Sequence, residues 1–322
     1  MKRLMLAGLM QALLLTACTG PGTVTPPAPA LETAAPRATP PATASAELTL
    51  EQLKNIQYGL QRSATPHSVA LIDGGFTAAD PAAQDFVRAR LLENVAFTDL
   101  DGDGKPDAAV LLAENYGGTG NFVSLIAMLN RDGAPEQGPS AYIDDRPHVN
   151  SLSAENGLIS LDVLVHGPGD PMCCAAQRKV MTFSLTQAGL TAQTVTSFTP
   201  DGKERSITIE SPVEGVEVSG SAQVAGSFTI SPFENTLAYR VYDAAGTEMA
   251  AGPITVTAPE MGGPGTFDAT IDLSAIPAGT PIRIAIQDIS AADGSIMAMD
   301  SVNVEVKLPS WLTPLFQPYG RR

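Results

Sequence analysis

The sequence predicts a mainly β protein of the α+β class, in which an N-terminal α+β domain with a mostly antiparallel sheet precedes a β-sandwich. Three observations support this prediction. Apolar and polar residues alternate throughout residues 205–307, and two segments near residues 108–113 and 122–129 are apolar over the length of a strand. The 322 residues also include 29 Gly and 26 Pro, which favour turns, and only 5% aromatic residues, so we expect aliphatic cores.

Length and charge limit the organisation of the chain and its partners. At roughly 150 residues per domain, the chain allows about two domains. Asp and Glu number 34 against 19 Lys and Arg, and the formal charge of −15 disfavours binding to nucleic acid. The one long apolar run is N-terminal, which excludes several membrane-spanning helices. The expected segments are a signal peptide (1–17), a stalk (18–47), two domains (48–200 and 205–307) and a C-terminal tail (308–322).

The first 18 residues combine a basic start, a short apolar stretch and a cysteine. Lys2 and Arg3 precede the apolar run Leu4–Leu15, which is too short to span a bilayer comfortably. The letters LTAC at positions 15–18 resemble the lipobox of bacterial lipoproteins, which implies cleavage before Cys18 and acylation of its sulfur with a fatty acid such as palmitate. We therefore expect a lipid anchor on the extracytoplasmic face of the cell membrane. An uncleaved signal anchor and an ordinary secretory signal are the alternatives.

Residues 19–47 have the composition of a stalk. Pro, Thr and Ala account for 21 of these 29 residues. Such a segment cannot bury enough apolar surface to offset the entropy lost on ordering, so we expect it to be extended and without a packed core. A stalk of this kind would hold the folded domains away from the membrane surface.

Two helices are expected at the start of residues 48–200. Thr49 and Gln52 have the spacing of a capping box, and the helix that would follow places Leu50, Leu53 and Ile56 on one face. A second helix is expected from Asp80 to about Asn94. Its inward positions would be Phe86, Ala89, and Leu92 or Val95.

Strand patterns follow these helices. The segments Ala108–Ala113 and Phe122–Leu129 are apolar on both faces, so we expect central strands joined by a glycine-rich hairpin loop. The segment Leu158–His166 alternates apolar and polar residues and predicts a half-buried strand. A further strand is expected at Lys179–Leu185, with Met181, Phe183 and Leu185 on one face.

An aspartate-rich motif lies directly before the first central strand. Asp99, Asp101, Asp103 and Asp107 occupy positions 1, 3, 5 and 9 of a loop with glycine at position 6, and Lys105 offers a backbone carbonyl at position 7. Hard oxygen ligands at this spacing resemble the calcium loops on β-hairpins of secreted bacterial domains, although the glutamate at position 12 of an EF-hand is absent. We expect a structural Ca²⁺ site; the alternative is a solvated acidic turn.

A second motif contains His166, Met172, Cys173 and Cys174 within a loop rich in Gly and Pro. Outside the cytoplasm, adjacent cysteines can form a disulfide, which would stiffen the loop and be easily reduced. There are two functional alternatives: a redox switch, and a soft-metal site formed by His166, Met172 and the thiols. A further structural alternative is that both cysteines are buried, reduced thiols. Because His166 lies on the outward face of its expected strand, we expect its side chain to be exposed.

Residues 205–307 contain about eight short alternating strands separated by turn signals, which is typical of an immunoglobulin-type sandwich. The segments ITIESPVEGVEVSGSAQVAGSF, FENTLAYRVYDAAGTEMAAG, GPGTFDATIDL and ISAADGSIMAMDSVNVEV resemble the immunoglobulin-like domain of bacterial spore germination proteins. The resemblance implies a fold with an interaction or spacer role, and it brings no catalytic residues. Residues 48–200 resemble an uncharacterised segment of bacterial envelope lipoproteins, which implies location only.

Motifs of several common enzyme classes are absent from the sequence: the nucleophile elbow, the zinc-protease helix motif and the phosphate-binding loop. The three histidines, His67, His148 and His166, lie far apart in the chain. The sequence therefore favours a non-enzymatic envelope lipoprotein with a structural or protein-interaction role and an envelope protein as partner. The alternatives are an envelope hydrolase or thiol redox protein that uses His166, Cys173 and Cys174, and a small-ligand receptor.

Overall fold

The computed structural model describes residues 47–63, 67–78, 80 and 85–307, which belong to one compact unit of the chain. The predicted signal peptide, Cys18, the stalk up to residue 46 and the tail 308–322 lie outside the described residues. Nearly all regular structure is β, which confirms the predicted fold class. No helix in the described ranges has the length and apolar character needed to cross a membrane.

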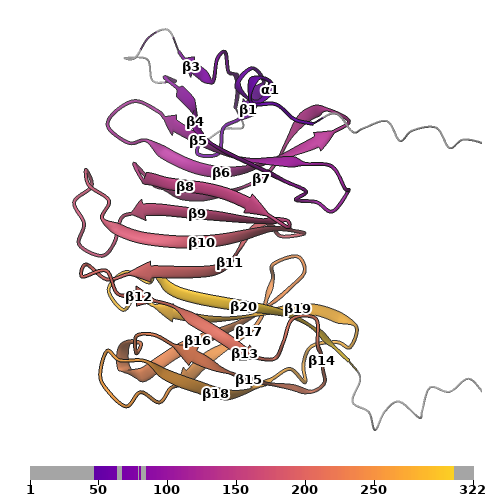
Figure 1. Ribbon diagram of the computed structural model, residues 1–322, viewed down its shortest axis with the longest axis vertical. Helices are drawn as coiled ribbons and strands as arrows, with labels where there is room; N and C mark the ends of the chain where they lie inside the picture. Colours follow the sequence, from indigo (N-terminus) through magenta and orange to yellow (C-terminus); the bar gives the residue numbers. More distant parts are fainter. Residues whose placement is uncertain (1–46, 64–66, 79, 81–84, 308–322) are drawn as a thin grey trace, which may run out of the picture. The chain divides into compact units, whose positions relative to one another are not determined.

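Residues 48–200 are here called the N-terminal region, and their described part contains one short helix followed by strands (Figure 1). The elements are α1 (Leu50–Lys54), β1 (Gln57–Gly59), β2 (Ser68–Ala70), β3 (Gly75–Thr77), β4 (Arg88–Thr98), β5 (Asp107–Asn115), β6 (Phe122–Arg131), β7 (Ala134–Asp145), β8 (His148–Glu155), β9 (Leu158–Val165), β10 (Gln177–Thr186) and β11 (Gly189–Phe198).

The first predicted helix is confirmed, together with its cap. The Thr49 side chain accepts a hydrogen bond from the Gln52 backbone N–H, and the Gln52 side chain accepts one from the Thr49 backbone N–H. Leu53 is fully buried, whereas Leu50 is 39% exposed and Ile56 lies beyond the helix end. The inner face of this helix is therefore narrower than its sequence pattern predicts.

The second predicted helix, Asp80 to Asn94, is wrong where the structure describes it, because residues from Arg88 onward form strand β4. Burial alternates from Arg88 to Leu91 with the period of two that defines a strand. The pairing of β4 with β5 then shifts between Leu91 and Val95, where the strand contains a bulge. This irregularity gave the apolar positions a helix-like spacing.

The five-stranded sheet has the order β3-β4-β5-β6-β7, and all of its neighbouring strands are antiparallel. Both faces of β5 are buried, in two different clusters. One cluster contains Ala108, Val110 and Leu112 together with helix α1, and the other contains Ala109, Leu111 and Ala113 together with β9 and β10. The prediction of β5 and β6 as central strands is confirmed, since residues of each pack into both clusters.

Residues 205–307, here called the C-terminal region, contain strands only, apart from a short 3₁₀ turn (Figure 1). A two-residue strand, β12 (Glu204–Arg205), lies at its start. The remaining strands are β13 (Ile207–Ser211), β14 (Glu217–Val218), β15 (Ser221–Phe228), β16 (Thr236–Asp243), β17 (Glu248–Thr255), β18 (Gly265–Asp272), β19 (Thr280–Ile289) and β20 (Ile296–Val306).

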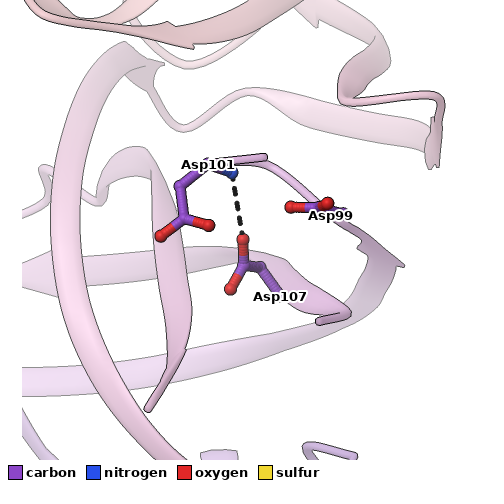
Figure 2. Close-up of side chains that lie close together, drawn as sticks. All are labelled: Asp99, Asp101 and Asp107. Carbon is purple, nitrogen blue, oxygen red and sulfur yellow. Dashed lines mark hydrogen bonds between the residues drawn. The ribbon is translucent and has the colours of Figure 1, made fainter. Parts of the chain in front are cut away.

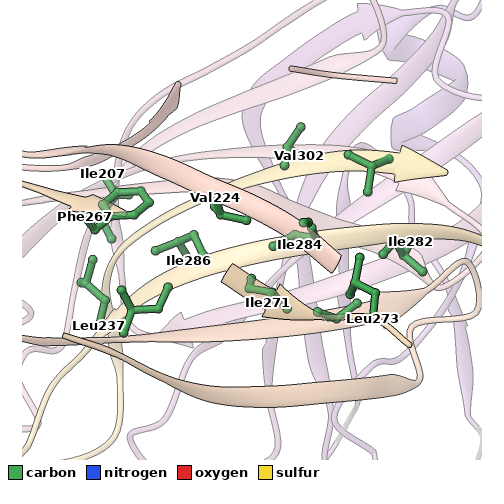
Figure 3. Packing of buried hydrophobic residues seen from close by; sticks show 14 of the residues in the cluster. Ile207, Val224, Leu237, Phe267, Ile271, Leu273, Ile282, Ile284, Ile286 and Val302 are labelled. Carbon is green, nitrogen blue, oxygen red and sulfur yellow. The ribbon is translucent and has the colours of Figure 1, made fainter. Parts of the chain in front are cut away.

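Two sheets form the sandwich of the C-terminal region. The sheet β13-β15-β18 packs against the strands β17-β16-β19-β20, and their inward side chains share one apolar cluster (Figure 3). Ile284 and Val224, from opposite sheets, are both fully buried in it. The predicted alternation is confirmed in β19, where Ile282, Ile284 and Ile286 point into this core.

One sheet includes strands of both regions. Its main path is β17-β16-β19-β20-β11-β10-β9-β8, and β12 and β14 pair at its sides to give ten strands. In this sheet, the strands of the two regions meet where Val195 in β11 pairs antiparallel with Met299 in β20. These two side chains and Ala285 form a small buried cluster of their own. The sequence patterns, which treat each region separately, did not predict this continuity.

Candidate functional site

The aspartate-rich loop connects β4 to β5, so it sits at one end of the five-stranded sheet. Carboxylate oxygens of Asp99, Asp101 and Asp107, one from each, lie within 4.8 Å of one another (Figure 2). The structure thus brings together three of the four predicted carboxylates, and Asp103 lies outside this group. Three oxygens at this separation have the chemistry and spacing to hold a hard cation such as Ca²⁺.

Backbone N–H groups hold two of these carboxylates in place. Asp107 is fully buried, and its Oδ2 accepts hydrogen bonds from the N–H of Leu100 at 2.9 Å and of Asp101 at 3.3 Å. Its Oδ1 accepts one from the N–H of Asn130 at 2.7 Å. Asp99 accepts hydrogen bonds from the N–H of Gly102 and Gly104, both at 2.8 Å, and both glycines have positive φ. The glycines are needed because other residues rarely adopt this backbone conformation.

Basic side chains lie beside the carboxylates of Asp101 and Asp103. Arg131, the last residue of β6, donates from Nη1 to Oδ2 of Asp101 at 2.8 Å. The Lys105 ammonium lies between Asp103, at 3.4 Å, and Asp132, at 3.0 Å. A hydrogen bond from the Lys105 backbone N–H, aided by the nearby ammonium, lowers the pKa of Asp103 below its usual range. The loop is therefore partly neutralised by the chain's own cations.

Arg131 is a residue that sequence reasoning missed. It lies thirty positions from Asp101 and reaches the loop only because β5 and β6 pair as a hairpin. Competition from such a cation weakens the attraction of a carboxylate cluster for a metal ion, since it neutralises part of the same negative charge. The carboxylate group nevertheless fits a cation site, because Asp99 and Asp107 form none of the described salt bridges.

The cysteine loop follows β9 and returns to β10. The structure contains a bond between the Sγ atoms of Cys173 and Cys174, and both residues are exposed. Asp170 closes the loop, because its Oδ2 accepts hydrogen bonds from the N–H of Gly167 at 2.9 Å and of Ala176 at 3.0 Å. With the sulfurs bonded to each other, neither is available as a thiolate nucleophile or metal ligand.

The expectation of an exposed His166 is wrong, because Asp144 at the end of β7 covers and binds its ring. Oδ2 of Asp144 lies 2.9 Å from Nδ1 of His166 and also accepts the His166 backbone N–H at 2.6 Å. The side chain of His166 is only 15% exposed. Burial lowers its pKa, but the hydrogen bond and charge of Asp144, aided by the Met172 carbonyl, outweigh burial and raise the pKa overall.

The predicted site residues therefore form two separate groups. The first is the aspartate loop, and the second is His166 with Cys173 and Cys174 in one loop. A carboxylate–histidine pair can orient a general base, but catalysis of acyl transfer also requires a nucleophile bonded to that base. In the described part of the chain, the His166 ring is hydrogen-bonded to the side chain of Asp144, whose carboxylate is an acceptor and takes no nucleophilic role there.

The paired sheets of the C-terminal region, with a shared apolar core and short connecting turns, define an immunoglobulin-like β-sandwich. In agreement with this class, residues 206–295 match the family described as the immunoglobulin-like domain of bacterial spore germination. The predicted resemblance is thus confirmed for this domain, which covers less than half of the chain. No curated protein matches the chain closely enough to count as a relative.

Proposed function

We propose that this protein is a lipid-anchored, extracytoplasmic component of the cell envelope with a non-enzymatic role in structure or protein interaction. The observation that supports this proposal is the match of residues 206–295 to an immunoglobulin-like family that is typically non-catalytic. The lipobox-like residues before Cys18 and the Pro-rich segment after it supply the anchor and the spacer in this proposal. The partner would be another envelope protein.

Metabolic labelling tests the anchor. Cells that express the full chain are fed an alkyne fatty acid, and the labelled protein is followed through membrane fractionation. We expect label and membrane association in the parent protein, and loss of both in Cys18→Ser, because acyl chains on that sulfur provide the membrane affinity. The double variant Cys173→Ser/Cys174→Ser is the matched thiol control and should keep the label. Unlabelled parent protein in the soluble fraction would contradict the proposal.

Crosslinking in intact cells tests the interaction role. A photo-crosslinking residue placed at exposed Phe233 of the sandwich should give a discrete adduct with one envelope protein, because specific interfaces place exposed apolar side chains in contact with a partner. The same residue placed at Ile72, an exposed apolar position of the N-terminal region, is the matched control for nonspecific capture. Identical adduct patterns at both positions would contradict a specific role of the sandwich.

We also propose that the aspartate loop binds Ca²⁺ in a structural role. The three converging carboxylates of Asp99, Asp101 and Asp107 support this, and extracellular sites of this type bind at about 0.1–1 mM. At several times such a dissociation constant, Ca²⁺ adds about 1 kcal/mol to the free energy of unfolding. The expected rise in melting temperature is about 2–4 °C for a protein of this size.

Thermal unfolding with EDTA or with millimolar Ca²⁺ measures this effect. Asp101→Ala should abolish the rise, because it removes one of the three converging oxygens. Asp132→Ala is the matched control, since Asp132 carries the same charge beside Lys105 but is 93% exposed and outside the carboxylate group. Equal responses of both variants, or no response of the parent protein, would leave the solvated acidic turn as the correct interpretation.

A further inference from the structure

A cavity of about 170 Å³ lies beside the turn that joins β10 to β11. Strands β16, β19 and β20 form its other walls. The side chains that matter for the argument come from both regions of the chain: Thr186, Ala188, Tyr242, Asp243, Arg283 and Asn303. Pockets for drug-sized ligands measure about 300–1,000 Å³, so this cavity admits only a small molecule.

Arg283 supplies the positive charge of this cavity. Its Nη1 donates to the backbone carbonyl of Ala192 at 3.2 Å, and its guanidinium carbon lies 4.8 Å from the centroid of the Tyr242 ring. These contacts fix the guanidinium plane but use few of its five N–H donors. Burial lowers the pKa of Arg283, as expected for a charge removed from water without a counter-ion.

Two other arginines, Arg205 and Arg178, are neutralised by carboxylates. Nε of Arg205 bonds to Oδ2 of buried Asp288 at 2.6 Å, and Arg178 bonds to Asp162 through two nitrogens at 2.7 and 3.1 Å. None of the ion pairs in the described ranges includes Arg283. A half-buried guanidinium without a carboxylate is costly, and the cost falls when an anion supplies the missing acceptor atoms.

The remaining walls restrict the charge and size of that anion. Asp243 also lines the cavity, and its Oδ1 accepts the Thr247 backbone N–H at 2.8 Å. Its negative charge would repel a second anionic group, so a ligand with a single carboxylate fits better than a dicarboxylate or a phosphate. Ala188 and the Tyr242 ring offer apolar surface for a short hydrocarbon chain.

We propose that this cavity binds a small monocarboxylate, whose oxygens accept hydrogen bonds from the Arg283 guanidinium while its apolar part lies against Ala188 and Tyr242. The site would make the protein a receptor or carrier for short-chain carboxylates. This inference goes beyond the proposed envelope role and does not depend on the lipid anchor, because every group that it uses lies within residues 186–303.

Titration with butyrate, followed by ¹H–¹⁵N NMR of the protein without its signal segment, tests the proposal. Saturable shifts are expected at the amides of Arg283 and Ala192, and butylamine and butanol should produce none. Arg283→Gln should weaken butyrate binding at least tenfold. Arg178→Gln is the matched control, because Arg178 also stacks on an aromatic ring but already has its carboxylate, and its loss should leave butyrate binding unchanged.

Ala188→Leu keeps the test decisive if Arg283→Gln fails to fold. Ala188 is exposed in the β10–β11 turn and lines the cavity, so a larger side chain there occupies part of the cavity without removing the charge. This variant should fold and also lose butyrate binding at least tenfold. Absence of saturable shifts with acetate, butyrate and hexanoate, or binding that Ala188→Leu leaves intact, would overturn the proposal.

Discussion

The most deeply buried carboxylates of the N-terminal and C-terminal regions have different partners. In the N-terminal region, β5 contains fully buried Asp107 at its start and fully buried Glu114 near its end, and neither forms one of the described salt bridges. Backbone N–H groups of the adjoining loops donate to both, and the Tyr116 hydroxyl also donates to Glu114. In the C-terminal region, buried Asp288 bonds to the guanidinium of Arg205, and the large core cluster of the sandwich consists of apolar residues.

This difference shows how the molecule positions its loops. Glu114 accepts hydrogen bonds from the backbone N–H of Gln61 at 2.8 Å and of Arg62 at 3.0 Å, and so fixes the segment after β1. Asp107 fixes the aspartate loop in the same way. A carboxylate that serves several backbone donors sets the path of a loop, whereas an apolar core sets only the packing of strands. The loop-building carboxylates of the N-terminal region therefore position its candidate site.

The largest expected effect comes from the apolar core of the sandwich. Ile284→Ala should lower the free energy of unfolding by about 4 kcal/mol, because Ile284 is fully buried and the substitution leaves a cavity. Ile284→Val, which removes one methylene, should cost about 1 kcal/mol. Denaturant unfolding measures both values. A loss of less than about 1 kcal/mol in the free energy of unfolding for Ile284→Ala would mean that apolar packing at this position does not stabilise the region.

Sequence patterns predicted the elements whose burial follows a simple period. The alternation of Ile282, Ile284 and Ile286 marks a strand because one face of the sandwich meets a continuous apolar core. No element was predicted at β7 or β8, because β7 contains Pro135, Gly138 and Pro139, and β8 is mostly polar. Pairing with neighbouring strands stabilises these segments, and a single-sequence pattern contains no information about such partners.

The next effect tests the buried carboxylate of the N-terminal region. Asp107→Asn should lower the free energy of unfolding by about 2 kcal/mol in EDTA, because the amide keeps one acceptor oxygen but turns an N–H₂ donor toward backbone donors. The matched control is Asp132→Asn, an exposed position where the expected change is within about 0.5 kcal/mol. A similar small change in both variants would mean that the backbone network around Asp107 contributes little.

Only those residues of the candidate sites that lie close together in the sequence were predictable. The spacing of Asp99, Asp101 and Asp107 along one turn was sufficient to predict that their carboxylates converge. Arg131 and Asp144 were not predictable, because each reaches its partner through tertiary structure across more than twenty residues. Arg131 reaches Asp101 through the β5–β6 hairpin. Asp144 reaches His166 through contact between strands β7 and β9 of different sheets. Arg283 was likewise outside the predicted sites, since the absence of its counter-ion becomes visible only when all neighbouring carboxylates are placed in space.

The smallest expected effect concerns His166, whose pKa is raised above its usual value by Asp144. Asp144 holds both the ring and the backbone of His166, and its carboxylate raises the histidine pKa. Because the folded-state pKa is above the unfolded value of about 6.5, the stabilisation is complete below that value and is lost as the pH rises through the folded-state pKa. The expected contribution is about 1 kcal/mol, the usual net value of a hydrogen bond.

An NMR titration of the His166 ring and denaturant unfolding at pH 5.5 and 8.5 measure this contribution. Asp144→Asn should lower the His166 pKa. It should also remove the part of the stability difference between pH 5.5 and pH 8.5 that comes from His166, and His166→Gln should remove the same part. Since both variants break the same hydrogen bond, the double variant should lose little more than either single one. An unchanged His166 pKa in Asp144→Asn would show that burial, which acts in the opposite direction, governs this histidine, and that the cysteine loop is not held by a titratable anchor.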